Sequence, residues 1–156
     1  FKNTIIIMTS NMGSGYIQSQ MEKLNSSNKE QIVEETKKEV MNMLKKTIRP
    51  EFLNRIDETI MFLPLNEKEI KQIVLLQIKG VQKMLAENGV ELKLTEGALD
   101  FLSQVGYDPE FGARPVKRAI QRYLLNDLSK KLLSQEVDRS KAITVDAGGD
   151  GLVFRN

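Results

Sequence analysis

Apolar residues recur at intervals of three and four along much of the chain, which predicts amphipathic helices. Local signals set their ends: Asn66 and Glu69 form the sequence pattern of a capping box, and Gly89 suits the left-handed residue that closes a helix. Pro50 ends an earlier helix, because the residue before a proline disfavours the helical backbone. The predicted helices cover residues 29–46, 51–56, 66–88, 95–106 and 115–135.

Other stretches carry the patterns of β-strands. Residues 4–9 are a continuous apolar and β-branched run, which is typical of a strand buried on both faces of a parallel sheet. Residues 58–63 predict a second strand, and residues 90–94 alternate like a half-buried strand. Two short alternating runs, 143–145 and 152–154, flank a glycine-rich turn and predict a β-hairpin.

These patterns predict two units of different fold class. Residues 1–64 carry the pattern of part of an α/β layer, and residues 65–156 that of a small α+β domain of helices and a short sheet. Residues 13–28, rich in Gly, Ser, Asn and Gln, predict a loop with at most a short helix. Two strands cannot build a parallel sheet covered on both faces, so we expect the rest of that sheet to lie in sequence outside this chain.

The amino-acid composition limits the size and class of the protein but indicates no particular binding partner. The 156 residues are 40% hydrophobic and 28% charged, with a formal net charge of +2, which allows one ordinary domain or two small units with a core. No apolar run approaches the ~18–20 residues of a membrane span. The first residues also lack the charged start and long apolar core of a signal peptide.

The chain contains no cysteine and no histidine. Disulfides, zinc sites built from these residues, Ser-His triads and cysteine nucleophiles are therefore excluded within it. Any chemistry must come from Arg, Lys, Asp, Glu, Asn, Ser, Thr or Tyr side chains. The lack of cysteine also fits a reducing compartment.

The first candidate site residue is Asn11, which follows the first predicted strand after Thr9 and Ser10. In α/β folds, ligands bind just beyond the carboxyl ends of the strands, where a short amide side chain can orient a water or a phosphate oxygen. The alternative is that the asparagine only begins a turn, and the local sequence alone favours that alternative.

The second candidate is Arg55, in a nine-residue stretch with a second arginine and two acidic residues, Glu51 and Asp57. An exposed arginine here could act as a finger that stabilises charge on a transferred phosphoryl group. The alternative is a local ion pair of Arg55 with one of the two acids, which would contribute only ~0–1 kcal/mol if exposed. The residues themselves leave both possibilities open.

The third candidate is Arg114, directly before Pro115, which suits the first position of the helix predicted over residues 115–135. The cap position then falls on an arginine, where a cation meets the positive end of the helix dipole at a cost of ~0.3–1 kcal/mol. A phosphate would satisfy both groups, because helix N-termini bind anions and the guanidinium is a fork for phosphate oxygens.

Arg114, Arg118 and Arg122 recur every four residues, so they share one face of the predicted helix. Besides an anion site, two alternatives stay open: an ordinary solvated basic face, and a helix that binds nucleic acid phosphates. The isoelectric point of about 8.8 and the lack of aromatic residues between the arginines speak against nucleic acid.

Two further motif classes give negative results. Residues 146–150 superficially resemble a calcium loop but lack its alternating aspartates and terminal glutamate, so we interpret them as a turn. No Gly-x-x-x-x-Gly-Lys-Ser/Thr loop occurs, and no apolar strand ends in the Asp-Glu pair of a Walker B motif. The chain by itself therefore cannot hold a magnesium nucleotide in the P-loop manner.

Three segments, each weak alone, together give a specific resemblance. They are FKNTIIIMTSNMG at residues 1–13, RPEFLNRIDE at residues 49–58 and GYDPEFGARPVKRAI at residues 106–120. In this order and spacing the chain closely resembles the C-terminal end of a Clp-type AAA+ unfoldase, most like the second ATPase module of a disaggregase. The resemblance covers essentially all 156 residues. It implies the C-terminal portion of a P-loop AAA+ large subdomain over residues 1–64 and a small lid subdomain over residues 65–156.

The resemblance also implies a role for each candidate residue. Asn11 matches sensor 1, which positions the attacking water near the γ-phosphate. Arg55 matches the arginine finger, which reaches the nucleotide of the neighbouring subunit, and Arg114 matches sensor 2, which reads the nucleotide from the small subdomain. The implied cofactor is ATP with Mg²⁺. Walker A, Walker B and the pore loop would lie upstream, so this chain alone should be inactive.

The implied partners are a homo-hexameric ring, unfolded or aggregated protein clients and a co-chaperone system, in the cytoplasm, with no nucleic acid and no membrane. Family members that dock onto the ClpP protease carry an Ile/Leu-Gly-Phe/Leu tripeptide between the first two motifs. Residues 12–48 contain none, which favours an ATP-dependent disaggregase over a ClpP-coupled unfoldase. A basic-helix module for nucleic acid is the other alternative.

Overall fold

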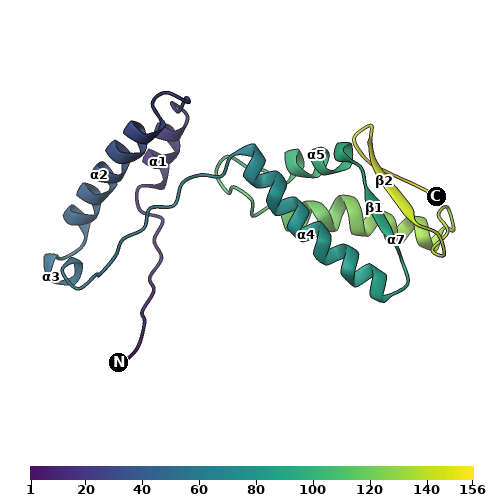
Figure 1. The fold of residues 1–156 in the computed structure, drawn as a ribbon, viewed down its shortest axis with the longest axis horizontal. Helices are drawn as coiled ribbons and strands as arrows, with labels where there is room; N and C mark the ends of the chain where they lie inside the picture. The colour runs from purple at the N-terminus through teal and green to yellow at the C-terminus, as the bar shows by residue number, and fades with distance from the viewer. The chain divides into compact units, whose positions relative to one another are not determined.

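The computed structural model describes residues 1–156, and the chain divides into two compact units, Phe1–Pro64 and Leu65–Asn156. We call them unit 1 and unit 2 and describe each by itself (Figure 1). None of their helices is both long and apolar enough to cross a lipid bilayer.

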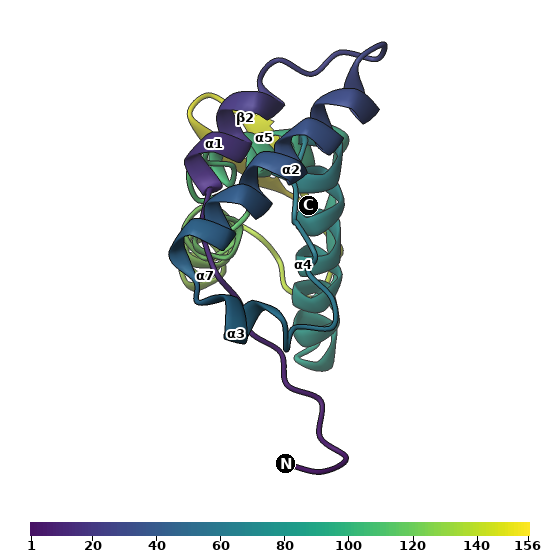
Figure 2. The same ribbon diagram turned by 90° about the vertical axis from the view of Figure 1, so that its left-hand side faces the viewer.

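Unit 1 is a helical hairpin with a short third helix. Its elements are α1 (Ser14–Met21), α2 (Lys29–Thr47) and α3 (Pro50–Leu53). Figures 1 and 2 both show α1 lying along α2. Gly13 allows this approach: it has a left-handed φ of +74°, and a Cβ on it would lie 3.2 Å from the Val40 side chain. The predicted helix over residues 29–46 is confirmed, and the short helix allowed within residues 13–28 is α1.

The two strands predicted in unit 1 are wrong for this structure. Residues 4–9 and 58–63 run without regular structure, and neither segment has a hydrogen-bonded neighbour in the unit. Their apolar side chains lie open: Ile5 is 88% exposed, Ile7 84% and Phe62 83%. A strand forms only by pairing with another strand. Unit 1 offers these two apolar segments no strand to pair with, so neither becomes the doubly buried strand that its sequence pattern predicts.

Unit 2 combines three long helical segments with a small sheet. In chain order its elements are α4 (Glu67–Glu87), β1 (Leu92–Leu94), α5 (Glu96–Val105), α6 (Val116–Ala119), η1 (Ile120–Leu125), α7 (Asn126–Leu133), β2 (Ile143–Gly148) and β3 (Gly151–Arg155). The sheet order is β1-β2-β3, with β1 parallel and β3 antiparallel to β2. The antiparallel pair of β2 and β3 confirms the predicted hairpin. The sheet packs against α5 (Figure 1).

The predicted helix faces of unit 2 meet in one hydrophobic core. The core side chains that are fully buried include Val74, Leu102, Leu124, Ile143 and Val145. They come from α4, α5, η1 and β2, so every layer contributes to the same cluster. Burial of this cluster, at roughly 1.5–3 kcal/mol for each large apolar side chain, holds the helices to the sheet.

Local capping signals begin and end the helices of unit 2 at the predicted residues. The Asn66 side chain accepts a hydrogen bond from the Glu69 N–H at 3.0 Å, and the Glu69 carboxylate accepts one from the Asn66 N–H at 2.8 Å. Gly89 has a left-handed φ of +75° just beyond α4. The Thr95 hydroxyl accepts from the Ala98 N–H at 3.2 Å and caps α5.

The helix predicted over residues 115–135 differs from the regular α-helix that we expected. α6, η1 and α7 follow one another without a break over residues 116–133, which we call the rod, and η1 is a π-helical segment of six residues. The Asn126 N–H donates to the Gln121 carbonyl, five residues back in the chain, which is the wider hydrogen-bonding step of a π-helix. The Gln121 side-chain amide also donates to the Asn126 side-chain oxygen at 2.9 Å.

The buried positions of the rod explain the π-helical segment. Val116, Ile120, Leu124 and Leu128 are all buried, and they recur every four residues. In a pure α-helix each such step rotates the side chain by about 40° beyond a full turn, so the row would drift by about 120° over three steps. A wider turn in the middle corrects this drift and keeps all four side chains in the core.

A hydrogen bond joins the start of α5 to the hairpin, and an ion pair lies within the hairpin at the same aspartate. The Thr95 hydroxyl donates to Asp146 Oδ1 at 2.6 Å, and Arg155 Nη2 lies 2.9 Å from Asp146 Oδ2. The Thr95 hydrogen bond, together with the Ala147 N–H and the charge of Arg155, holds the pKa of the Asp146 carboxyl below its usual range. The Asp146 carboxylate thus stabilises the contact between the start of α5 and the hairpin.

We expect the free energy of unfolding to fall as the pH drops below about 4, the ordinary pKa of an aspartate. The folded-state pKa of Asp146 is lowered, so its contribution is present above the unfolded-state value and is lost as the pH falls through the folded-state value. Urea denaturation at pH 7, 4 and 3 should show a smaller fall for Asp146→Asn. Asp150→Asn is the control, because Asp150 lies exposed in the hairpin turn. Equal falls in both variants would contradict the assignment.

Candidate functional site

Asn11 lies at the end of the extended segment that leads into α1. Its carbonyl oxygen accepts a hydrogen bond from the Ser14 N–H at 3.1 Å, so the backbone turns here. The Asn11 side chain is exposed and makes no hydrogen bond within the chain. The turn that we considered as an alternative is therefore formed, and it leaves the side-chain amide free.

Arg55 lies just beyond α3, where a run of hydrogen-bonded turns fixes the backbone. The Arg49 carbonyl accepts from the N–H groups of Phe52 and Leu53 at 3.0 and 3.1 Å, and the Arg55 N–H donates to the Phe52 carbonyl at 3.1 Å. Pro50 occupies the first turn of α3, where its missing N–H costs nothing. The short helix thus holds the backbone of Arg55 in one place.

The side chain of Arg55 is exposed and forms no ion pair. In particular it does not pair with Glu51 or Asp57, so the local ion-pair alternative is wrong in this structure. A guanidinium with no partner in its own unit carries five donors for an external acceptor.

Arg114 follows a tight loop between α5 and the rod. The Asp108 side chain accepts from the N–H groups of Glu110 and Phe111 at 2.8 and 2.9 Å, which closes the loop at its first residue. The Asp108 N–H donates to the Gly112 carbonyl at 3.0 Å, and Gly112 has a left-handed φ of +62°. The Arg114 N–H then donates to the Phe111 carbonyl at 3.3 Å. These bonds place Arg114 at the exit of the loop.

Gly106 anchors the same loop to the core. A Cβ on this residue would lie 2.7 Å from the Leu102 carbonyl oxygen and 3.0 Å from Val116 Cα. Only glycine permits this contact between the end of α5 and the start of the rod. The backbone on both sides of the Arg114 loop is therefore held at a fixed separation.

The cap position predicted for Arg114 is wrong by one residue. The rod begins at Val116, its cap is Pro115 with a helical φ of −70°, and Arg114 lies one residue further out in the turn. α6 itself has only four residues before the π-helical segment. The Arg114 side chain is exposed and makes no hydrogen bond or ion pair within the chain.

Arg118 and Arg122 lie on the side of the rod that faces away from the core, and Arg114 precedes the rod in the turn; we call these three residues the arginine row. Each is exposed, and Arg118 is offset by two residues, or about 200° of helical rotation, from Val116, where the buried row starts. The Arg122 guanidinium lies over the Tyr123 ring, 5.2 Å from its centroid. Arg114 and Arg118 have no such contact. Residues 111–126 contain no acidic side chain that could neutralise the row.

Asn11 and Arg55 belong to unit 1 and Arg114 to unit 2. Each residue is held by its own local structure, and neither unit by itself contains a cleft that all three line. No group of three or more acidic, histidine or cysteine side chains is placed to hold a metal ion.

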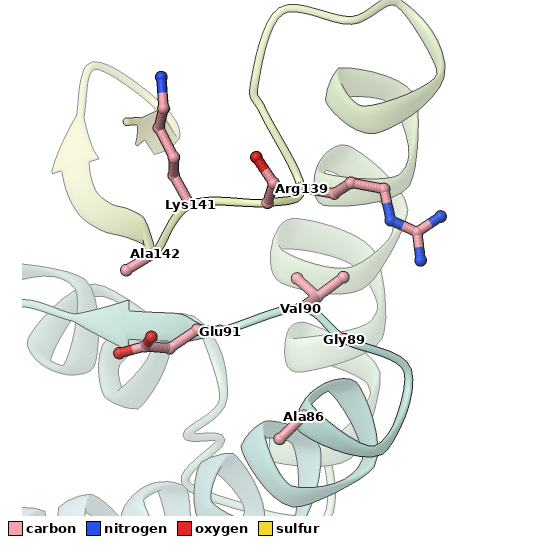
Figure 3. Close-up of a pocket in the computed structure, with 8 residues that line it drawn as sticks. Ala86, Gly89, Val90, Glu91, Arg139, Lys141 and Ala142 are labelled. Carbon is pink, nitrogen blue, oxygen red and sulfur yellow. The ribbon is translucent and has the colours of Figure 1, made fainter.

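A surface hollow lies elsewhere in unit 2, between the end of α4 and the segment before β2. It has a volume of about 330 Å³, and its lining includes Glu91, Arg139 and Lys141. Figure 3 shows these three charged side chains pointing away from one another. The Arg139 guanidinium donates to the Asn88 carbonyl at 3.1 Å and so serves the end of α4. The charged side chains of this hollow therefore do not converge on a common point where they could act on a ligand together.

Family models account for both units. The model described as the C-terminal, D2-small domain of ClpB protein matches residues 65–145, and the AAA domain (Cdc48 subfamily) matches residues 1–59. The chain belongs to the ClpB family. The predicted resemblance to Clp-type AAA+ proteins of the disaggregase branch is thereby confirmed, and so is the fold class.

Individual relatives agree with this assignment. The chain is 88% identical over 156 residues to the chaperone protein ClpB of Bacteroides thetaiotaomicron and covers 18% of that protein. It is 54% identical to the chaperone protein ClpB of Porphyromonas gingivalis, again over 100% of this chain and 18% of the relative. It also matches a solved structure, the Hsp104-ADP complex of S. cerevisiae, with a TM-score of 0.77 and 36% identity over 96% of this chain and 25% of that one. The chain thus spans less than a fifth of the length of these ClpB relatives.

Proposed function

We propose that this chain forms part of an ATP-dependent protein disaggregase and supplies three residues to its second ATPase module. Asn11 positions the attacking water, Arg55 contacts the nucleotide of a neighbouring subunit, and Arg114 contacts the nucleotide bound in its own subunit. The observation that carries the proposal is the 88% identity to a ClpB chaperone over the whole chain. The exposed, uncommitted side chains of all three residues support it.

Each role suits the chemistry of phosphoryl transfer. Catalysis of this reaction depends on positioning the nucleophile and on stabilising charge that develops on the transferred phosphoryl group. An amide can both donate to and accept from a water, which Asn11 would use to orient the nucleophile. A planar guanidinium binds two phosphate oxygens at once, which suits Arg55 and Arg114.

The described residues fit the phosphates of ATP but not its metal ion. Arg55 and Arg114 offer donors to phosphate oxygens, whereas no cluster of carboxylates is placed to hold Mg²⁺. The chain also has no Gly-x-x-x-x-Gly-Lys-Ser/Thr loop. The parts that bind Mg-ATP would therefore come from other sequence of the full-length protein, and we expect no ATP hydrolysis by this chain alone.

The assembled protein would be a homo-hexamer that acts on unfolded or aggregated clients, together with a co-chaperone system, in the cytoplasm. The ClpB and Hsp104 relatives support this proposal. The absence of an Ile/Leu-Gly-Phe/Leu tripeptide from residues 12–48 disfavours the alternative of a ClpP-coupled unfoldase. Stable association of the full-length protein with ClpP would revive that alternative.

The proposal is tested with a chimera in which this chain replaces the matching segment of B. thetaiotaomicron ClpB. The first ATPase module is inactivated, so that binding reports on the second. We expect Arg114→Ala to weaken the affinity for a fluorescent ADP by about tenfold or more, because a hydrogen-bonded contact to a charged group is worth about 1.5–3 kcal/mol. Arg122→Ala is the matched control, since Arg122 is engaged with Tyr123. Unchanged ADP affinity and turnover in Arg114→Ala would refute the role of Arg114.

A further inference from the structure

We propose that Asn88, at the end of α4, is a site of spontaneous deamidation, and that three hydrogen bonds of unit 2 hold it in an unreactive conformation. Asn88 is the only asparagine of the sequence that precedes a glycine. The modification does not depend on the proposed function, because it changes the chain itself and involves no nucleotide.

The reaction needs only the chain and water. The backbone nitrogen of Gly89 loses its proton and attacks Cγ of the Asn88 side chain. A bond forms between that nitrogen and Cγ, the bond from Cγ to Nδ2 breaks, and Nδ2 leaves as ammonia with the proton that the Gly89 nitrogen lost. Water then adds to one of the two carbonyls of the cyclic succinimide and opens it to an aspartate or an isoaspartate. No group is oxidised or reduced.

Side chains do not shield the reacting atoms. Asn88 and Gly89 are both exposed. A Cβ added to Gly89 would meet no other heavy atom within 4 Å, so the space beside its backbone is open. Because glycine has no Cβ of its own, nothing on Gly89 hinders the approach of the Asn88 amide. The pair also lies at a helix end, where local opening costs little free energy.

The backbone conformation of Asn88 keeps the reacting atoms apart in the folded chain. The succinimide ring is nearly planar, so closing it requires the Gly89 nitrogen to eclipse Cβ about the Cα–C bond of Asn88. In unit 2 the ψ of Asn88 is 11°, and the Gly89 nitrogen therefore nearly eclipses the Asn88 backbone nitrogen instead. The substituents of a tetrahedral Cα are spread evenly around it, so the Gly89 nitrogen is turned away from Cβ. Ring closure thus needs a large rotation of ψ.

Three hydrogen bonds oppose that rotation. The Gly89 N–H donates to the Ala86 carbonyl at 3.0 Å, and the Asn88 side-chain amide donates to the Met84 carbonyl at 2.9 Å. The third bond comes from a distant segment, because the Arg139 guanidinium donates to the Asn88 carbonyl at 3.1 Å. Rotation of ψ turns this carbonyl away from Arg139, and the attack requires both amides to leave their acceptors. The site therefore reacts only after the end of α4 has opened.

Deamidation would also prevent the end of α4 from closing again in the same way. An aspartate side chain has no N–H group to donate to the Met84 carbonyl. Its negative charge would lie at the negative end of the helix dipole. The modification at Asn88 is thus a lasting chemical record that this helix end has opened.

The test follows deamidation of the 156-residue chain by peptide mapping with mass spectrometry, in buffer and in guanidinium chloride at a concentration that unfolds it. We expect Asn88 to react at least about tenfold faster in the unfolded chain, because unfolding removes all three hydrogen bonds. Asn88→Gln is the control that assigns the signal to this residue, since a glutamine would have to close a larger ring.

A second comparison tests the contact from Arg139. We expect Arg139→Ala to deamidate about threefold faster than the parent in buffer, because one of the three restraints is lost, and at the same rate as the parent in denaturant. Lys141→Ala is the matched control, since Lys141 is an exposed cation of the same segment that pairs with Asp138. Circular dichroism checks that both variants are folded.

Several outcomes would overturn the inference. Asn88 would not be the reactive site if other asparagines lost their amides before it in denaturant. Equal rates of Asn88 deamidation in buffer and in denaturant would mean that the folded conformation gives no protection. A rate for Arg139→Ala in buffer that equals that of Lys141→Ala, or is slower than that of the parent, would show that Arg139 does not restrain the site.

Discussion

Replacing Arg55 by alanine is expected to lower ATP hydrolysis by the second ATPase module on the order of 10³-fold while leaving nucleotide affinity nearly unchanged. An arginine supplied by a neighbouring subunit stabilises charge that develops in the transition state and contributes little to holding the ground-state nucleotide. Arg55 suits that task because its backbone is fixed by the turns after α3 and its side chain has no internal partner.

The measurement is steady-state ATP turnover in the chimera, with ADP affinity measured in parallel. Arg55→Lys keeps the charge but loses the planar fork, so we expect it to recover little activity. Arg49→Ala is the matched comparison, because Arg49 is also exposed and lies six residues away on the other side of α3. Near-normal turnover in Arg55→Ala, or a greater loss in Arg49→Ala than in Arg55→Ala, would contradict the assignment.

The second large effect concerns the stability of unit 2. Leu124→Ala is expected to lower the free energy of unfolding by about 2–5 kcal/mol, because it removes a fully buried side chain and leaves a cavity. Leu124 is 0% exposed and lies in the π-helical segment, among side chains from the other helices and from the sheet. Urea denaturation of the 156-residue chain, followed by far-ultraviolet circular dichroism, measures the change.

Leu133→Ala is a close control for this prediction. Leu133 lies on the same rod and undergoes the same substitution, but its side chain is 86% exposed. We expect a change of less than about 0.5 kcal/mol, the usual range for surface positions. Similar losses in the two variants would mean that the rod is not packed against the core as described.

Most of unit 2 could be predicted from local sequence signals. The capping box at Asn66, the cap at Thr95 and the left-handed Gly89 all formed, because each depends on groups within a few residues of one another. The periodic apolar positions also identified the core faces, since a helix must bury one stripe wherever it packs.

The π-helical segment was missed although the sequence contained a signal for it. Val116, Ile120, Leu124 and Leu128 recur every four residues, a period longer than the 3.6 residues of an α-helix. We interpreted the stretch as regular helix because short apolar series fit both periods. A test of the four-residue period over three steps would have indicated the wider turn.

For the candidate site, the sequence supplied the residue types and their order but not their surroundings. The motifs identified Asn11, Arg55 and Arg114 through a resemblance, and the family assignment is confirmed. The catalytic and nucleotide-binding roles of these three residues stay predictions. Only the structure distinguished a paired Arg55 from a free one, because ion pairing depends on where side chains lie in space.

The two apolar runs of unit 1 mark the clearest division between local and tertiary information. Residues 4–9 and 58–63 have the composition of buried strands, yet they lie unpaired and exposed. Helices and caps form from hydrogen bonds between near neighbours in the chain, so sequence alone was sufficient for them. Strands depend on partners that are distant in sequence, and only the tertiary structure could decide whether they form.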